Sequence, residues 1–300
     1  MKRMCTAMMF LAPLASFAAM AQDIDSKEVQ RRLQAMPPEK RQELLQNLME
    51  ATDQFNLIVD LQSGTCKRAS EVQMKAMQGD AHSVYVLSDM YHNGWCVAQD
   101  AKQFHAYLEK AAAVGVASAA FDLGMFSEDG REGYSMNYTA AERWYERAIK
   151  GGDERAMLKL GTMRVEGKGR KDAAGGIRLL QQAANSKDNL DASKRALGLL
   201  GLYFLDGKFL PRNVAKARSY GLTAAARCEP LGMLIVAMTY DTPTTLVQAY
   251  AWTNAAVEHA DPSQQQFAVN ARNDYESRMD AGSIVKGQAL TTALPVCASQ

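Results

Sequence analysis

The sequence lacks the compositional extremes that mark several classes of protein. Its 300 residues include only 8 prolines and 21 glycines, too few for a collagen-like or linker-rich chain, and the formal net charge is +1. A nucleic-acid-binding protein that relies on bulk charge would be far more basic, and a disordered chain would hold fewer hydrophobic residues than the 47% present. Long runs of valine, isoleucine and threonine are missing too, whereas alanine is abundant and there are 17 methionines. This composition favours helices.

The N-terminal segment has the three parts of a secretory signal peptide. Lys2 and Arg3 precede an apolar stretch over residues 4–21, which ends with small residues at the −3 and −1 positions of a cleavage site. A membrane anchor is the alternative, but Pro13 interrupts a run that is already short for a bilayer. We therefore expect residues 1–21 to be removed on export and the remaining chain, which has no long apolar run, to be periplasmic.

A pattern of five positions recurs four times in the middle of the chain. When a small residue stands at position i, leucine stands at i+4 and another small residue at i+5. Position i+8 is aromatic in two of the copies, and glycine stands at i+11. The copies are Ser83-Leu87-Ser88-Tyr91-Gly94, Ala119-Leu123-Gly124-Ser127-Gly130, Ala156-Leu160-Gly161-Arg164-Gly167 and Ala196-Leu200-Gly201-Phe204-Gly207. This spacing predicts one face of a helix that ends in a left-handed glycine cap. A weaker fifth copy begins at Gly232 and has Pro243 in the last position.

Each copy is followed by a second helical pattern of apolar residues, which starts at Phe104, Ala141, Gly176, Ala217 and Ala249. One helix pair cannot bury its own apolar face, so successive pairs must stack. This arrangement resembles the Sel1-like repeat family, relatives of the tetratricopeptide repeats with a slightly longer unit. The resemblance covers about residues 69–260. It implies an all-α fold, a right-handed α-solenoid of stacked antiparallel helix pairs.

The segments on both sides of the repeats are expected to be helical as well. Residues 22–68 are predicted to form an N-terminal helical cap, which includes a helix from Glu39 to about Leu61. Residues 69–260 hold about five repeats, the last of them degenerate. Residues 261–300 are predicted to form C-terminal capping helices and a tail.

Four cysteines follow the expected cleavage site, an even number that suits disulfides in an oxidising compartment. In an antiparallel solenoid, Cys66 and Cys96 fall at neighbouring helix ends, which favours a Cys66–Cys96 bridge. Cys228 ends the second helix of the fourth copy, and the C-terminal tail must reach back about two helix pairs to form a Cys228–Cys297 bridge. The cysteine spacing matches neither a zinc ribbon nor a thioredoxin-type redox motif.

The sequence offers little for catalysis. It has no G-x-S-x-G, no phosphate-binding glycine loop and no H-E-x-x-H. His82 and His92 are about three helical turns apart, too far to bind one metal ion together. We therefore predict a protein that is not an enzyme, with no catalytic residues, no metal and no cofactor.

The resemblance implies that the first helices line a concave groove that binds another protein. Groove positions then lie two and five residues on either side of the leucine of each copy. The candidate partner-binding residues at these positions are His82, Tyr85, Asp89, His92, Phe121, Met125, Glu128, Arg155, Leu158, Thr162, Arg195 and Leu202. Aromatic residues, methionine and arginine are enriched in interface cores. The alternative is that these residues form only the solvated inner face of a superhelix.

These observations predict a monomeric periplasmic scaffold that binds another protein. We expect it to bind no nucleic acid and to have no membrane span. The most specific hypothesis is an immunity protein that neutralises a secreted toxin of the phospholipase type, delivered by a type VI secretion system. The alternative is an adaptor for envelope polysaccharide or secretion machinery. A hydrolase of cell-wall or β-lactam substrates is a third hypothesis, but it predicts one cysteine pair in each repeat, which the sequence lacks.

Overall fold

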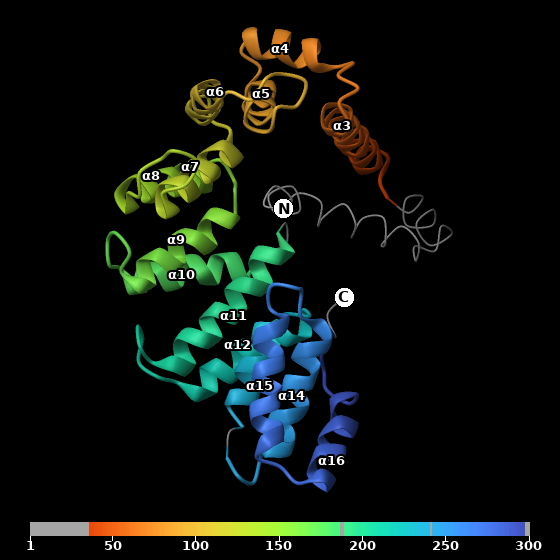
Figure 1. Ribbon diagram of the computed structural model, residues 1–300, viewed down its shortest axis with the longest axis vertical. Coiled ribbons are helices and arrows are strands. Elements are labelled where there is room, and N and C mark those ends of the chain that lie inside the picture. The colour runs from red at the N-terminus through yellow and green to blue at the C-terminus, as the bar shows by residue number, and fades with distance from the viewer. Residues whose placement is uncertain (1–35, 187–188, 241, 298–300) are drawn as a thin grey trace. The chain divides into compact units, whose positions relative to one another are not determined.

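The computed structural model describes residues 36–186, 189–240 and 242–297, and within these ranges its regular structure is helical, without a strand (Figure 1). The helices are α3 (Pro38–Gln62), α4 (Ala69–Met77), α5 (Ala81–Asn93), α6 (Ala101–Ala113), α7 (Ala117–Asp129), α8 (Tyr138–Lys150), α9 (Arg155–Glu166), α10 (Ala173–Ala184), α11 (Leu190–Asp206), α12 (Val214–Ala226), α13 (Pro230–Met238), α14 (Leu246–His259), α15 (Gln265–Ser277) and α16 (Ala281–Thr291). The all-α prediction is confirmed. The expected signal peptide at 1–21 and the beginning of the predicted cap lie outside the described residues.

The chain divides into two compact units, of which the first ends at Ser70 and the second begins at Glu71. Helix α3 belongs to the first unit and begins at Pro38, where the missing N–H of proline leaves no intrahelical hydrogen bond unmade. It contains the helix that the sequence predicts from Glu39 to Leu61, with one more residue at each end.

The end of the first unit is held by contacts of Arg68. Its backbone N–H donates a hydrogen bond to the Asp60 carboxylate at 2.9 Å, and its guanidinium pairs with Asp53 at 2.9 Å. Because both carboxylates belong to α3, these contacts fold the segment after the helix back along its last turns.

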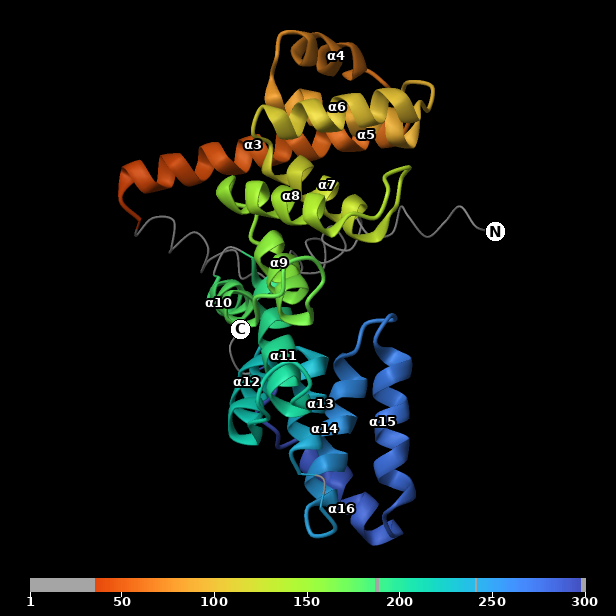
Figure 2. The same ribbon diagram turned by 90° about the vertical axis from the view of Figure 1, so that its left-hand side faces the viewer.

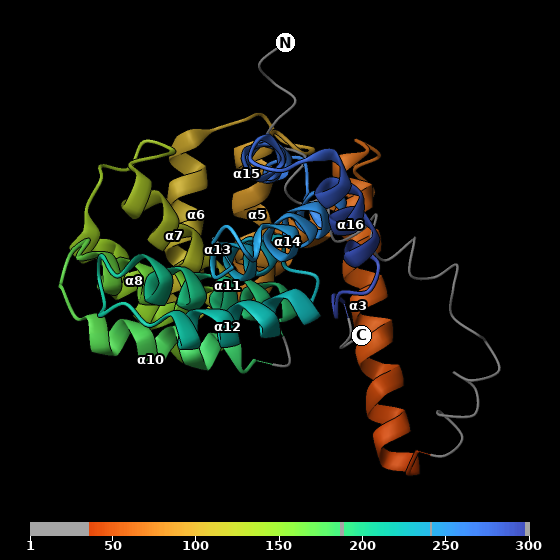
Figure 3. The same cartoon turned by 90° about the horizontal axis from the view of Figure 1, so that it is seen from below.

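The second unit is a succession of helix pairs. α5 packs on α6, α7 on α8, α9 on α10, α11 on α12 and α13 on α14, while α15 and α16 both contact α14. Figure 3 shows α8, α10 and α12 on one side of this unit and α13 and α15 on the other. At the C-terminal end, α13, α14 and α15 lie side by side (Figure 2). The stacked pairs confirm the α-solenoid.

The first helix of each repeat copy ends as the sequence predicts. α5, α7, α9 and α11 stop at Gly94, Gly130, Gly167 and Gly207, each with a left-handed backbone of φ between 65° and 75°. In every case the glycine N–H donates to the carbonyl four residues earlier. A side chain is strained in this conformation, so glycine defines the end of the helix.

The second helices of the pairs each begin at a capping side chain. α6, α8, α10 and α12 start after Asp100, Asn137, Asp172 and Asn213, and each of these side chains accepts a backbone N–H from the first turn of its helix. Such an N-cap satisfies one of the free amides at a helix start and typically contributes about 1 kcal/mol.

Small residues allow the two helices of a pair to approach closely. Between α9 and α10, a Cβ atom on Gly176 would lie 2.6 Å from the backbone oxygen of Gly161, closer than any real Cβ contact. At the C-terminal end the aromatic side chains of Trp252 and Tyr275 are buried among alanines of α12, α13 and α14. Among the described residues, no helix is both long and apolar enough to cross a membrane.

Candidate functional site

The helices α5, α7, α9, α11, α13 and α15 follow one another along one surface of the second unit, which we call the first-helix face. The hydroxyl of Tyr85 on α5 donates to Asp122 on α7, and the hydroxyl of Tyr203 on α11 donates to Glu166 on α9. Helix α13 contacts both α11 and α15. The predicted groove positions belong to the first four of these helices.

Six residues near the beginning of this face form what we call the tyrosine–aspartate cluster. They are Tyr85 and Asp89 of α5, Phe121 and Asp122 of α7, and Asp153 and Arg155 at the start of α9. The Tyr85 hydroxyl lies 2.8 Å from the Asp122 carboxylate. The Arg155 Nε donates to Asp153 at 2.9 Å, and the guanidinium lies 4.1 Å from the centre of the Phe121 ring.

Burial changes the ionisation of two of the three carboxyl groups of the cluster, those of Asp89 and Asp122. It raises the pKa of Asp89 to about 7, with a further contribution from the negative charge of Asp122. Burial also raises the pKa of Asp122 to about 6, although the Tyr85 hydroxyl and the Arg155 charge act in the opposite direction. The pKa of Tyr85 is raised by burial and by both aspartates, so its hydroxyl keeps the proton that it donates.

A hollow of about 350 Å³ adjoins the cluster. Asp153 and Arg155 form part of its wall, together with Ser118 and Asn189 and the backbone at 151–152. Its lining is mostly polar, so it suits a polar or charged group better than an apolar one.

A second hollow, which we call the apolar pocket, lies farther along the first-helix face. It has a volume of about 620 Å³ and is lined by side chains of α11, α13, α14 and α15 and by Arg212. Its apolar lining includes Leu202, Leu234, Met238 and Phe267. Met238 and Phe267 are 51% and 62% exposed, which is unusual for side chains so well suited to a core.

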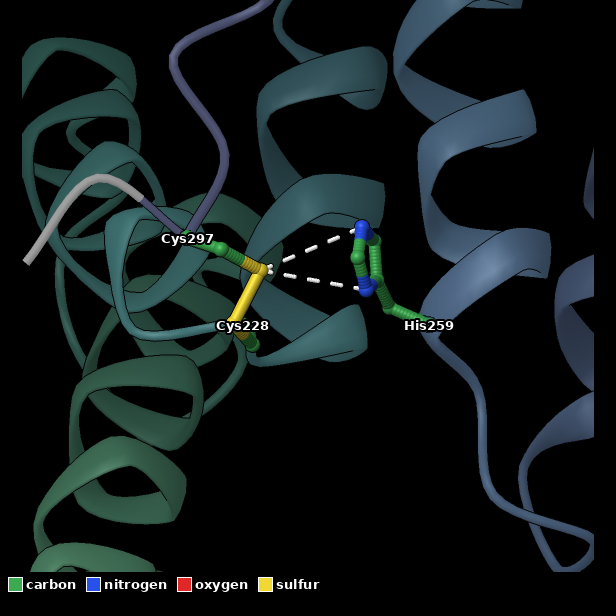
Figure 4. Close-up of side chains that lie close together, drawn as sticks. All are labelled: Cys228, His259 and Cys297. Carbon is green, nitrogen blue, oxygen red and sulfur yellow. Dashed lines mark hydrogen bonds between the residues drawn. A yellow bond between two sulfur atoms is a disulfide. The ribbon is translucent and has the colours of Figure 1, made fainter. Parts of the chain in front are cut away.

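Cys228, His259 and Cys297 come together at the C-terminal end of the second unit (Figure 4). A disulfide joins Cys228 to Cys297, and the two ring nitrogens of His259 lie 3.8 and 3.9 Å from the Cys297 sulfur. The Cys297 N–H also donates to the carbonyl of Ala225. The disulfide thus ties the C-terminal tail to the segment after α12, and its sulfurs are not free thiolates for a metal ion. Cys66 and Cys96 are disulfide-bonded as well, and their pairing with each other stays a prediction.

A model of the Sel1 repeat family matches residues 81–116, 117–153, 154–188 and 194–227. These four segments follow the pairs α5–α6, α7–α8, α9–α10 and α11–α12. The chain belongs to the Sel1 repeat family. Repeats of this family are typically non-catalytic scaffolds for protein interaction. The predicted fifth, degenerate copy and the caps lie outside the matched segments, so these assignments stay predictions.

Solved structures of other proteins are similar to parts of this chain. A Sel1 repeat protein from Oxalobacter formigenes is similar over 70% of this chain and 86% of its own, with 22% identity and a TM-score of 0.59. A Sel1 repeat protein from Klebsiella pneumoniae is similar over 69% of this chain and 98% of its own, with 22% identity and a TM-score of 0.44. The immunity protein Pa5087 from Pseudomonas aeruginosa is similar over 72% of this chain and 76% of its own, with 15% identity and a TM-score of 0.34. At 22% identity and a TM-score of 0.59, the likeness to the Oxalobacter formigenes protein shows the fold alone.

The remaining predicted groove residues of this Sel1 repeat protein are spread over other environments. His82 is exposed, whereas the His92 ring packs 4.5 Å from that of Phe104 on α6. Glu128 accepts a hydrogen bond from the buried Tyr145 at 2.7 Å. Of the predicted set, Tyr85, Asp89, Phe121 and Arg155 come together, Leu202 reaches the apolar pocket, and Met125, Leu158, Thr162 and Arg195 join neither group.

Local contacts hold some of these side chains away from the tyrosine–aspartate cluster and from the apolar pocket. The Thr162 hydroxyl donates to the carbonyl of Leu158 within α9, and Leu158 itself packs against the core between α9 and α11. Arg195 is exposed and acts electrostatically on Glu229 and Asp261. Their role in binding stays a prediction.

Sequence reasoning missed Asp122 and Asp153 in the cluster. Asp122 lies 37 residues after Tyr85, one repeat along the chain, so a search for polar pairs one repeat apart finds it. It also missed the α13 and α15 side of the apolar pocket. The groove positions of a Sel1 repeat were read only from the four glycine-ended copies, whereas Phe267 belongs to a helix outside them.

Proposed function

We propose that this protein is a non-enzymatic periplasmic scaffold that binds a partner protein along the first-helix face. The observation that carries the proposal is that this one face holds both the tyrosine–aspartate cluster and the apolar pocket. Protein interfaces typically combine an apolar anchor site with polar groups that fix orientation. The family match agrees with a scaffold role.

The apolar pocket supplies the anchor in this proposal. Phe267 and Met238 expose large apolar surfaces beside a hollow that is big enough for one aromatic or aliphatic side chain. Covering apolar surface contributes about 25 cal/mol for each Å² removed from water, so such a pocket favours an apolar side chain of the partner.

The specific form of the proposal is an immunity protein whose partner is a secreted toxin of the phospholipase type. The signal peptide predicted from the sequence would bring the protein to the periplasm, which such a toxin enters. The disulfide-bonded state of Cys66, Cys96, Cys228 and Cys297 agrees with an oxidising compartment. An envelope assembly adaptor would share both features and differ in its partner.

Co-expression with candidate toxins of the phospholipase type tests the proposal. The wild-type protein should restore growth and bind the purified toxin in calorimetry. Phe267→Ala should weaken that binding by about tenfold or more, because it removes an aromatic anchor, whereas Val285→Ala should not. Val285 is a suitable control because it is 63% exposed on α16, away from the pocket lining.

If none of these toxins is neutralised, the immunity role is wrong. If a partner binds equally well to the wild-type protein and to Phe267→Ala, the apolar pocket is not where it binds. Purification of a stable complex with an envelope component in place of a toxin would support the adaptor role.

A further inference from the structure

The charges of the tyrosine–aspartate cluster are not balanced within the described residues. Arg155 is its one cation and is held by Asp153, with hydrogen bonds from Nε at 2.9 and 3.2 Å to the two carboxylate oxygens. Asp122 accepts the Tyr85 hydroxyl at 2.8 Å. For Asp89, the described part of the chain places no donor within hydrogen-bond distance of the carboxyl group. The cluster therefore holds three carboxyl groups and one guanidinium.

The ionised Asp89 side chain lowers the stability of the fold in this position. Its carboxyl group is enclosed by protein on most sides, yet part of the side chain reaches solvent on the first-helix face. A buried carboxylate without a partner is unfavourable, and the nearby Asp122 adds repulsion between like charges. A cation that approached from the solvent side would remove both penalties at once.

Other ligand chemistries fit the cluster less well. An anion would meet the carboxylates of Asp89 and Asp122, and the guanidinium that could attract it is already paired with Asp153. An apolar group would bury the Asp89 carboxyl group further without supplying a donor. The hollow of about 350 Å³ beside Asp153 and Arg155 leaves room for a polar side chain next to the cluster.

We propose that the tyrosine–aspartate cluster binds a basic side chain of the partner protein, an arginine or a lysine, between the carboxylates of Asp89 and Asp122. This inference rests on the proposed function, because it names the chemistry by which a partner is recognised on the same face. Tyr85 holds the Asp122 carboxylate in place, and the Arg155–Phe121 stack closes the α9 side of the site.

Binding of a cation here depends on pH. The groups that act on Asp89 and Asp122 are each other, Tyr85 on α5, and Asp153 and Arg155 at the start of α9. Both carboxyl groups must lose their protons to form ion pairs with the incoming side chain. The site is therefore formed above about pH 7 and lost as the pH falls below about 6.

A short peptide tests the inference without knowledge of the partner. The probe is acetyl-Gly-Arg-Gly-amide, and the matched control is the same peptide with citrulline, which has the shape of arginine but no charge. The full chain, labelled with ¹³C, is titrated with each peptide while the carboxyl signals of Asp89 and Asp122 are followed by NMR. The titrations are run at about pH 8, above both pKa values, and at about pH 5, below both.

We expect the arginine peptide to shift both signals in a saturable way at the higher pH and to bind about tenfold more weakly at the lower one. Asp89→Asn should weaken its binding to the same extent, and Asp191→Asn, an exposed residue of α11, should leave it unchanged. Equal shifts with the citrulline peptide, or no shift with the arginine peptide, would overturn the inference even if Asp89→Asn failed to fold.

The outcome is distinct from that of the proposed function. A peptide that binds while no partner protein is found on the first-helix face would leave the cation site standing and the scaffold proposal unsupported. A partner whose affinity depends on Phe267 but not on Asp89 would support the scaffold proposal and overturn the cation site.

Discussion

The hydroxyl of Tyr85 on α5 donates a hydrogen bond to the carboxylate of Asp122 on α7, across 37 residues of sequence and one repeat of the solenoid. The bond joins two first helices side by side and fixes one of the two carboxylates of the proposed cation site. Its acceptor is charged above about pH 6, which strengthens it relative to a bond between neutral groups.

Tyr85→Phe should therefore lower the free energy of unfolding by about 1–2 kcal/mol at neutral pH. It should also raise the pKa of Asp122 above its value of about 6, because the hydroxyl stabilises the ionised form. Urea denaturation and a ¹³C NMR titration measure the two effects. Tyr107→Phe is the control, since the Tyr107 ring stacks on Tyr91 at 5.6 Å and the described residues give its hydroxyl no partner. An unchanged Asp122 pKa would contradict the bond.

Asp89→Asn should stabilise the protein at about pH 8 and leave its stability nearly unchanged at about pH 4. The pKa of Asp89 rises from 3.8 in the unfolded chain to about 7 in the fold, so the folded protein holds this proton more tightly. The stability that this proton provides is present below about pH 4 and is lost as the pH rises through about 7. Asparagine carries no charge at any of these pH values.

The expected gain at the higher pH is on the order of 2 kcal/mol, less than the full pKa shift implies because part of the side chain reaches solvent. Urea denaturation of the wild type and the variant across this pH range gives the difference. Asp191→Asn on α11 is the exposed control and should show no such pH-dependent gain. A variant that is less stable than the wild type at about pH 8 would show that the Asp89 carboxylate has a stabilising partner.

The disulfide between Cys228 and Cys297 closes a loop with a sequence separation of 69 residues around α13 to α16. Cys297→Ser should lower the free energy of unfolding by about 2–4 kcal/mol, since the open chain gains freedom in its unfolded state. Cys228→Ser should lower the free energy of unfolding by the same amount. The double variant should lower it no more than either single variant does. Thermal unfolding under non-reducing conditions measures all three.

His259→Ala is the control for the loss of contacts around the disulfide. The ring is exposed and touches the Cys297 sulfur at 3.8–3.9 Å, so its removal should cost less than about 1 kcal/mol. If the cysteine variants unfold no more easily than His259→Ala does, the tail is not held by this bridge.

The local features of the fold could be predicted from the sequence, whereas the site could be predicted only in part. Gly94, Gly130, Gly167 and Gly207 mark helix ends because a left-handed backbone is a property of one residue and its neighbours. The pairing of Tyr85 with Asp122 depends on how far one helix pair is rotated against the next. Helical periodicity describes a single helix and does not contain that rotation.

The apolar pocket could not be predicted from the sequence, for a related reason. Leu202 occupies a predicted groove position, but Phe267 comes from a helix that has no counterpart in the four repeats. Its place is decided by the contacts of α15 with α13 and α14, which is tertiary packing at the end of the solenoid. A single sequence shows that α15 is helical without showing which helices it covers.

Gly176→Ala should destabilise the protein although alanine favours helices more than glycine does. A Cβ atom at this position would lie 2.6 Å from the Gly161 oxygen and 2.9 Å from the Val165 nitrogen, both backbone atoms that cannot move without parting α9 from α10. Overpacking of this kind typically costs about 1–3 kcal/mol, more than the gain of up to about 1 kcal/mol in helix propensity.

Gly282→Ala on α16 is the matched control. Its Cβ atom would meet only the Asp280 side chain, at 3.2 Å, so the unfolding free energy should change by less than about 1 kcal/mol. Urea denaturation of both variants compares the two effects directly. If Gly176→Ala is as stable as the wild type, the two helices are separated by more than the structure places between them, and small residues are not what sets the spacing of the Sel1 pair.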